Sequence, residues 1–139
     1  MSNTLHPIRW LFAAPCESVT ALRIVGWWEL RRIPFNLVVG IFGIFAFTVF
    51  FMSICSAGVL EPGEDAVEPM ALFLVPIAAN LCYTAGWLVD VPLRFIRPSL
   101  SPRFTPLLFC LGLGFSLFVI SLPAIIWGTY RLLQLLHFL

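Results

Sequence analysis

The sequence predicts an all-α integral membrane protein in which a short interfacial helix precedes three transmembrane helices. The 139-residue chain is 60% hydrophobic and only 11% charged, whereas a soluble domain carries about 25% charged residues. So little polar surface does not cover a water-soluble globule. Three uncharged segments have about 20 residues or more, which is the length an α-helix needs to cross a bilayer. Arginine is also unevenly divided between the segments that connect them, as in proteins with a fixed membrane orientation.

The polar connections are too short to fold alone, so a single membrane domain is predicted over residues 1–139. The net charge is +1, and the eight basic residues, all Arg, are divided among short segments. A basic face of the kind that binds nucleic acid is therefore not expected.

The first predicted element is a helix over about residues 17–33, which contains most of "CESVTALRIVGWWELRR". Its first turn carries Glu17, and an acidic residue suits a helix N-terminus. Trp27, Trp28 and Arg31 stand shortly before the first uncharged segment, and such side chains collect at the depth of lipid head groups. We therefore expect them to be interfacial anchors of a helix on the cytoplasmic face of the membrane.

The transmembrane helices follow an expected elbow at Pro34. Proline favours the first turn of a new helix, because its missing N–H has no partner there in any case. Pro123 is expected to kink the last span near one end. The spans are predicted over about residues 35–60, 70–89 and 104–130.

Arginine is concentrated on one side of these spans. Seven of the eight arginines precede the first span or lie between the second and third, and only Arg131 follows the third. The loop "EPGEDAVEP" between the first two spans has four acidic and no basic residues. Because connections rich in basic residues stay in the cytoplasm, the amino terminus and the 90–103 loop are predicted to be cytoplasmic, and the carboxyl end periplasmic.

Polar residues within the spans form the candidate site. Asn80, Tyr83 and Thr84 share one face of the second helix at i, i+3, i+4 spacing. An unpaired carboxamide near the bilayer midplane is costly, so this face should point towards the other spans. We expect Asn36 to bond Asn80 directly or through a water. Two interpretations stay open: hydrogen bonds that fix helix packing, or the wall of a small cavity that opens to the cytoplasm.

Charged side chains flank this face. Glu29 is placed to pair with Arg32 at i+3, with Arg23 or with an arginine of a loop. The alternative is a general base or proton site in a pocket under the elbow. Asp90 and Arg94 have the spacing of an i,i+4 pair, although Pro92 disfavours a regular helix there. The sequence assigns no residue a catalytic role.

Metal and cofactor sites are not expected. The four cysteines fall one per segment without a CxxC motif, and a buried cysteine usually behaves as a small apolar residue. His6 and His137 lie outside the predicted spans, so a haem held by two histidines within the membrane is excluded. The sequence contains no GxSxG, HExxH or phosphate-binding glycine motif.

The polar positions resemble those of a group of small bacterial integral membrane proteins. The shared elbow pattern consists of Trp28, Glu29, Arg32 and Asn36. It is followed by "NLCYTAG", an Asn-x-x-Tyr-Thr-x-Gly pattern that ends at Gly86. Phe35 stands where the group would have a tyrosine. The resemblance covers about residues 23–90 and implies a bacterial inner-membrane location, but it brings no activity with it.

The function favoured by these observations is a non-enzymatic scaffold, accessory subunit or homo-oligomer. Three helices enclose little space, and the small residues Gly40, Gly43 and Ala46 are spaced to let helices approach closely. The expected partners are membrane lipids with further copies of the chain or a larger membrane complex. Two alternatives stay open. One is an enzyme or binding protein for lipid or quinone head groups that uses Glu29 and Asp90, and the other is a small transporter or channel.

Overall fold

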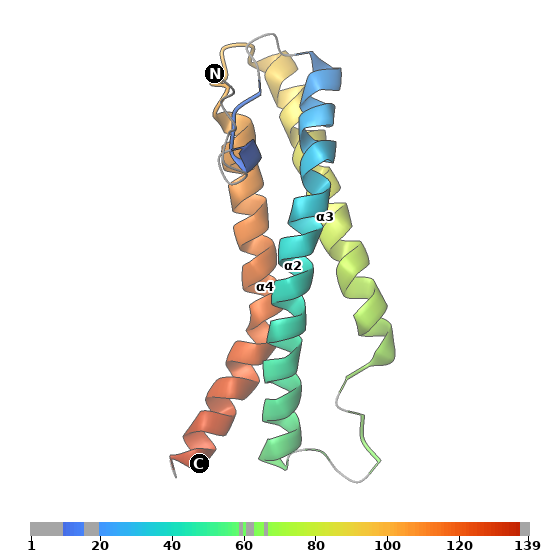
Figure 1. Cartoon of the computed structure of the whole chain (residues 1–139), viewed down its shortest axis with the longest axis vertical. Helices are drawn as coiled ribbons and strands as arrows, with labels where there is room; N and C mark the ends of the chain where they lie inside the picture. The colour runs from blue at the N-terminus through green and yellow to red at the C-terminus, as the bar shows by residue number, and fades with distance from the viewer. Residues whose placement is uncertain (1–9, 16–19, 59, 61–62, 66, 137–139) are drawn as a thin grey trace, which may run out of the picture. The chain divides into compact units, whose positions relative to one another are not determined.

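The computed structural model describes residues 10–15, 20–58, 60, 63–65 and 67–136. These residues form no strand, and they contain the helices α2 (Ala21–Ala57), α3 (Pro69–Ile96) and α4 (Phe104–Leu135) (Figure 1). All three helices are long and apolar enough to cross a membrane. The predicted all-α class is confirmed, as is the number of helices of spanning length among the described residues.

Helix α2 is continuous where the sequence predicts two helices joined by an elbow. It passes through Pro34 without interruption, so the division into separate helices at that residue is wrong; residues 17–19 of the predicted first helix lie outside the described part. A proline removes one backbone hydrogen bond but does not force a helix to end. Leaving the helix in an apolar segment would unpair several more backbone groups, so continuation costs less free energy.

Helix α3 also continues through a proline. The predicted span ends at Val89, but the helix passes Pro92 and ends at Ile96. Asp90 and Arg94 therefore lie one helical turn apart on a regular helix. Helix α4 likewise continues through Pro123 beyond the predicted end of its span.

The chain divides into two compact units. Unit 1 contains the described residues up to Asn36 together with Asn80–Leu113. Its core is largely aromatic and includes Trp28, Tyr83 and Phe109, which are at most 4% exposed. Unit 1 therefore holds nearly all of the polar and aromatic residues that the sequence marks as candidates.

Unit 2 contains Leu37–Ala79 and the described residues from Gly114 onward. Its core is aliphatic and small, with Ala46 and Ile54 buried. A Cβ added to Gly128 would lie 3.9 Å from Ser53 Oγ, which is an ordinary contact distance between α4 and α2. Of the small residues whose spacing predicts close helix contact, Gly43 places an added Cβ 3.9 Å from Ile120 of α4 and Ala46 is 4% exposed, whereas a Cβ added at Gly40 meets no atom within 4 Å.

The helices expose large apolar side chains. Leu22 is 85% exposed and Ile33 78%. Contiguous apolar surface of this kind marks a site of interaction with another protein or with a membrane. Together with the three helices of spanning length, it indicates a membrane protein.

Candidate functional site

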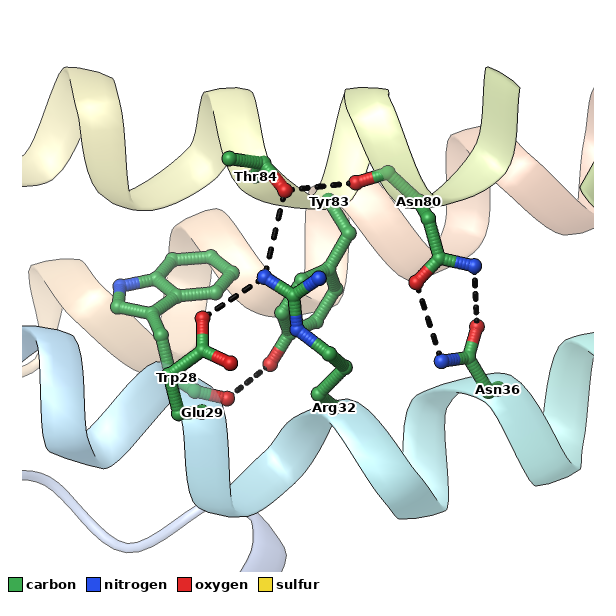
Figure 2. Close-up of polar contacts among 7 residues, drawn as sticks. All are labelled: Trp28, Glu29, Arg32, Asn36, Asn80, Tyr83 and Thr84. Atoms are coloured by element: carbon green, nitrogen blue, oxygen red, sulfur yellow. Dashed lines mark hydrogen bonds and ion pairs between the residues drawn. The ribbon is translucent and has the colours of Figure 1, made fainter. Parts of the chain in front are cut away.

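Arg32 is the centre of a polar cluster between α2 and α3 in unit 1. Its Nη2 atom donates to Glu29 Oε1 at 2.7 Å and to Thr84 Oγ1 at 3.3 Å (Figure 2). The side chains of Arg32 and Glu29 are 30% and 45% exposed, so the predicted i,i+3 pair exists but is partly accessible. The guanidinium carbon lies 5.2 Å from the centre of the Tyr83 ring, and Nε is buried without a hydrogen-bond partner among the described residues.

Asn36 and Asn80 form a reciprocal pair of side-chain hydrogen bonds. Asn36 Nδ2 donates to Asn80 Oδ1 at 3.2 Å, and Asn80 Nδ2 donates to Asn36 Oδ1 at 3.0 Å (Figure 2). The predicted bond between these residues is confirmed in its direct form. Thr84 Oγ1 donates to the Asn80 backbone oxygen at 2.8 Å, which connects this pair to the Arg32 cluster. Each carboxamide thus satisfies one donor and one acceptor of the other, the arrangement that lowers the cost of placing both in an apolar segment.

Tyr83 belongs to the aromatic core of unit 1. Its hydroxyl donates to the backbone oxygen of Trp28 (Figure 2). The Tyr83 ring centre lies 4.6 Å from that of Phe35 and 5.4 Å from that of Trp28. Phe109 of α4 adds an edge-to-face contact at 6.4 Å. Tyr83 is therefore a packing residue with a satisfied hydroxyl, since buried tyrosines require such a partner.

The indole ring of Trp28 packs directly against Gly86. A Cβ added at Gly86 would lie 2.7 Å from Trp28 Cη2 and 2.8 Å from Cζ3. Real Cβ atoms do not approach carbon this closely, so only glycine leaves room for the indole ring. This contact gives a physical role to the glycine that ends the Asn-x-x-Tyr-Thr-x-Gly pattern.

Asp90 forms a second polar network on the other side of Trp28. The carboxylate is fully buried and accepts from Trp28 Nε1 at 3.1 Å and from Thr105 Oγ1 at 2.7 Å. Arg94 Nε donates to its other oxygen at 3.0 Å, and Arg94 Nη2 donates to Thr105 Oγ1 at 2.7 Å. The predicted pair of Asp90 and Arg94 is confirmed, and the network joins α2, α3 and the first turn of α4.

The contacts of Asp90 with Trp28 and Thr105 are not part of the sequence prediction, which names Trp28 only as an interfacial anchor and in the elbow pattern. Trp28 is 62 positions from Asp90 along the chain, and no local spacing indicates their contact. Thr105 carries a weaker signal, because it stands in the first turn of α4, shortly after the loop that follows Arg94. Without the fold, neither residue is identified as a partner of Asp90.

The prediction of interfacial anchors is corrected by the structure. Trp27, Trp28 and Arg31 are 7%, 2% and 4% exposed, so their side chains lie inside unit 1 rather than against lipid head groups. The position of these residues next to an apolar segment is typical of interfacial anchors, but all three side chains contact other residues of the protein. Trp28 takes part in the Asp90 network, and the other two contact the amino-terminal segment.

Arg31 holds residues 10–15 against α2. Its guanidinium carbon lies 3.9 Å from the centre of the Trp27 ring and 4.5 Å from that of Trp10. It donates to the backbone oxygens of Trp10, Leu11 and Trp27, and Trp27 Nε1 donates to the Ala13 backbone oxygen at 2.8 Å. Backbone carbonyls and ring faces thus replace the water that a buried guanidinium loses.

The site offers few groups that are free to react. Asp90 is fully buried and accepts three hydrogen bonds. Tyr83 and the two asparagines are hydrogen-bonded within the protein. Glu29 and Arg32 alone in this cluster are both charged and partly accessible. Among the described residues, no group of three His, Cys, Asp or Glu side chains is placed to hold a metal ion. Comparison of the chain with known protein families, with curated proteins and with solved structures found no match.

Proposed function

We propose that this chain is a non-catalytic, three-span membrane protein that assembles with further copies of itself or with a larger membrane complex. The observation that carries the proposal is that its polar side chains are hydrogen-bonded to other residues of the same unit. Asn36, Asn80, Thr84 and Asp90 bond across or along helices of the same unit. Such bonds set the register and the facing surfaces of helices in a membrane. They leave little polar chemistry free for a substrate.

Membrane placement supports the same proposal. Helix α2 has 37 residues and is therefore about 55 Å long at about 1.5 Å per residue, whereas a bilayer core is about 30 Å thick. Part of α2 then lies outside the hydrocarbon region. We assign this part to residues before Pro34, at the cytoplasmic face of a bacterial inner membrane, because Arg23, Arg31 and Arg32 fall there.

A compartment reporter tests this orientation. A reporter inserted after Ser99, in the loop between α3 and α4, is expected to be cytoplasmic, and one fused after Leu139 periplasmic. The reason is the excess of arginine before the first span and between the second and third. Alkaline extraction of the membranes serves as the control for insertion. Reporters that read the same compartment would contradict the proposed threading.

Assembly is tested by the mass of the particle in a mild detergent. A single chain has a mass of 15.6 kDa. We expect a particle whose protein mass, after correction for bound detergent, corresponds to several copies or to this chain with a stoichiometric protein partner. A monomer without a protein partner would overturn the assembly proposal.

A second candidate function rests on Glu29 and Arg32. These residues form a partly accessible ion pair in unit 1, and a carboxylate beside a guanidinium is suited to a lipid or quinone head group. A monomer that copurifies with one such amphiphile in stoichiometric amount, and loses it on Glu29→Gln substitution, would favour this function over assembly.

A further inference from the structure

A groove on the surface of unit 1 is lined by residues that belong to neither polar network. It has a volume of about 670 Å³ and runs along the first two turns of α4. Its walls are mainly apolar: Phe104, Leu107 and Cys110 come from α4, and Phe12 and Ala14 from the amino-terminal segment that Arg31 holds in place. Phe12 is 41% exposed and Leu107 56%, so the apolar lining is open to the surroundings.

One end of the groove is polar and positively charged. Ser101 and Arg103 line it there, and the Arg103 backbone N–H donates to Ser101 Oγ at 3.3 Å. Arg97 does not line the groove but stands at the start of the same loop, where its backbone oxygen accepts from the Leu100 N–H at 3.1 Å. Both arginines are exposed, and neither guanidinium has a hydrogen bond or ion pair with a described residue. The only carboxylate in this part of α3, that of Asp90, is already bound by Arg94.

We propose that this groove binds one anionic phospholipid, with an acyl chain along α4 and the phosphate on Arg103 and Arg97. The direction of the groove fits such a ligand. Its charged end is the loop before α4, and its apolar part extends along α4 from Phe104 to Cys110, about 9 Å at about 1.5 Å per residue. In a spanning helix this path leads from the head-group layer into the hydrocarbon.

The chemistry favours an anionic phospholipid over other ligands of a membrane protein. Guanidinium groups bind phosphate through paired hydrogen bonds, and the anionic charge is what two exposed arginines select. A neutral quinone would leave both arginines unused, and a small water-soluble anion would leave the apolar walls uncovered. The inference rests on the proposed membrane insertion but not on the proposed assembly.

The test uses the full-length protein equilibrated in nanodiscs that contain equal amounts of palmitoyl-oleoyl phosphatidylglycerol and the corresponding phosphatidylcholine. After release into a mild detergent, retained lipids are counted by native mass spectrometry. We expect one phosphatidylglycerol per chain to be retained in preference to phosphatidylcholine. Arg103→Gln should reduce this preference about fivefold, the effect of one arginine near an anionic lipid surface.

Matched variants test the charge of Arg103 and the free volume of the groove separately. Arg131→Gln removes the same charge from the other end of α4 and should leave retention unchanged. Ala14→Trp fills the groove and should abolish retention, whereas Leu111→Trp introduces the same side chain at an exposed position of α4 outside the lining and should not. Each variant is compared only after its helix content matches the original protein.

Three results would overturn the inference. Equal retention of both lipids would show that the arginines do not select the head group. Unchanged retention in Ala14→Trp would show that the lipid lies elsewhere. A dimer that the original protein forms and Ala14→Trp loses would show that a second copy occupies the groove. If the chain is extracted from membranes by alkali, the membrane proposal itself fails, so the two failures are distinguishable.

Discussion

Replacing Asp90 by alanine should lower the free energy of unfolding by about 3–5 kcal/mol. The carboxylate is fully buried and accepts hydrogen bonds from Trp28, Arg94 and Thr105. Its removal leaves the Arg94 guanidinium, whose side chain is 9% exposed, without a counter-charge. Unfolding in mixed micelles of a mild detergent and dodecyl sulfate, followed by far-ultraviolet circular dichroism, measures the loss.

The ion pair of Glu29 and Arg32 provides the matched control. It also joins an acid to an arginine within one helix, but both side chains are partly exposed. Glu29→Ala should therefore cost only about 0–1 kcal/mol. The double substitution Asp90→Ala with Arg94→Met should cost less than Asp90→Ala alone, because no unpaired charge remains. Equal losses in Asp90→Ala and Glu29→Ala would contradict the role assigned to burial.

Gly86→Ala should destabilise the protein by about 1–3 kcal/mol, which is the usual cost of forcing extra atoms into a packed core. The sign of this change is diagnostic, because replacing glycine by alanine in a helix interior normally stabilises a protein by about 0.5–1 kcal/mol. Here the added Cβ would lie 2.7 Å from the Trp28 ring. The same unfolding measurement detects the change.

Gly26 supplies the comparison within unit 1. It also lies inside a helix, but a Cβ added there meets no atom within 4 Å, so Gly26→Ala should be neutral or stabilising. In the double variant of Gly86→Ala and Trp28→Phe, the smaller ring should remove the collision. The loss of unfolding free energy in the double variant should therefore be smaller than the sum of the losses in the two single variants. Strict additivity would mean that Trp28 and Gly86 are not in contact.

Local features of the site were predictable from the sequence because helical periodicity fixes them. The i,i+3 pair of Glu29 and Arg32 depends only on a continuous helix. The spacing of Asp90 and Arg94 also indicates a pair, although Pro92 is expected to disfavour the helix that forms it. The bond between Asn36 and Asn80 is a long-range contact, yet it was predictable, since each carboxamide in an apolar helix requires a polar partner. Asn36 and Asn80 are the two carboxamide side chains in the predicted spans, and each can both donate and accept.

Other features were not predictable, because they depend on which surfaces the fold brings together. Trp27 and Arg31 are of the residue types, and at the position, that are typical of interfacial anchors. They are buried by contacts with residues 10–15 and, for Trp27, with Phe109. Continuity of α2 through Pro34 reflects the balance between one lost hydrogen bond and the cost of ending a helix in an apolar segment. The sequence shows where the proline is, but it does not show which of these two costs is larger.

Burial of Arg31 and Arg94 has a consequence for how the protein is made. Basic residues orient a nascent chain while they are still in water, yet in the folded unit Arg31 is 4% exposed and Arg94 is enclosed by Asp90 and Thr105. In the proposed orientation, the same charges therefore act at two separate times. During insertion they retain their segments on the cytoplasmic side, and after insertion they are withdrawn from solvent to join the folded helices. If the proposed orientation holds, a neutral substitution at either position is expected to affect threading and folding together.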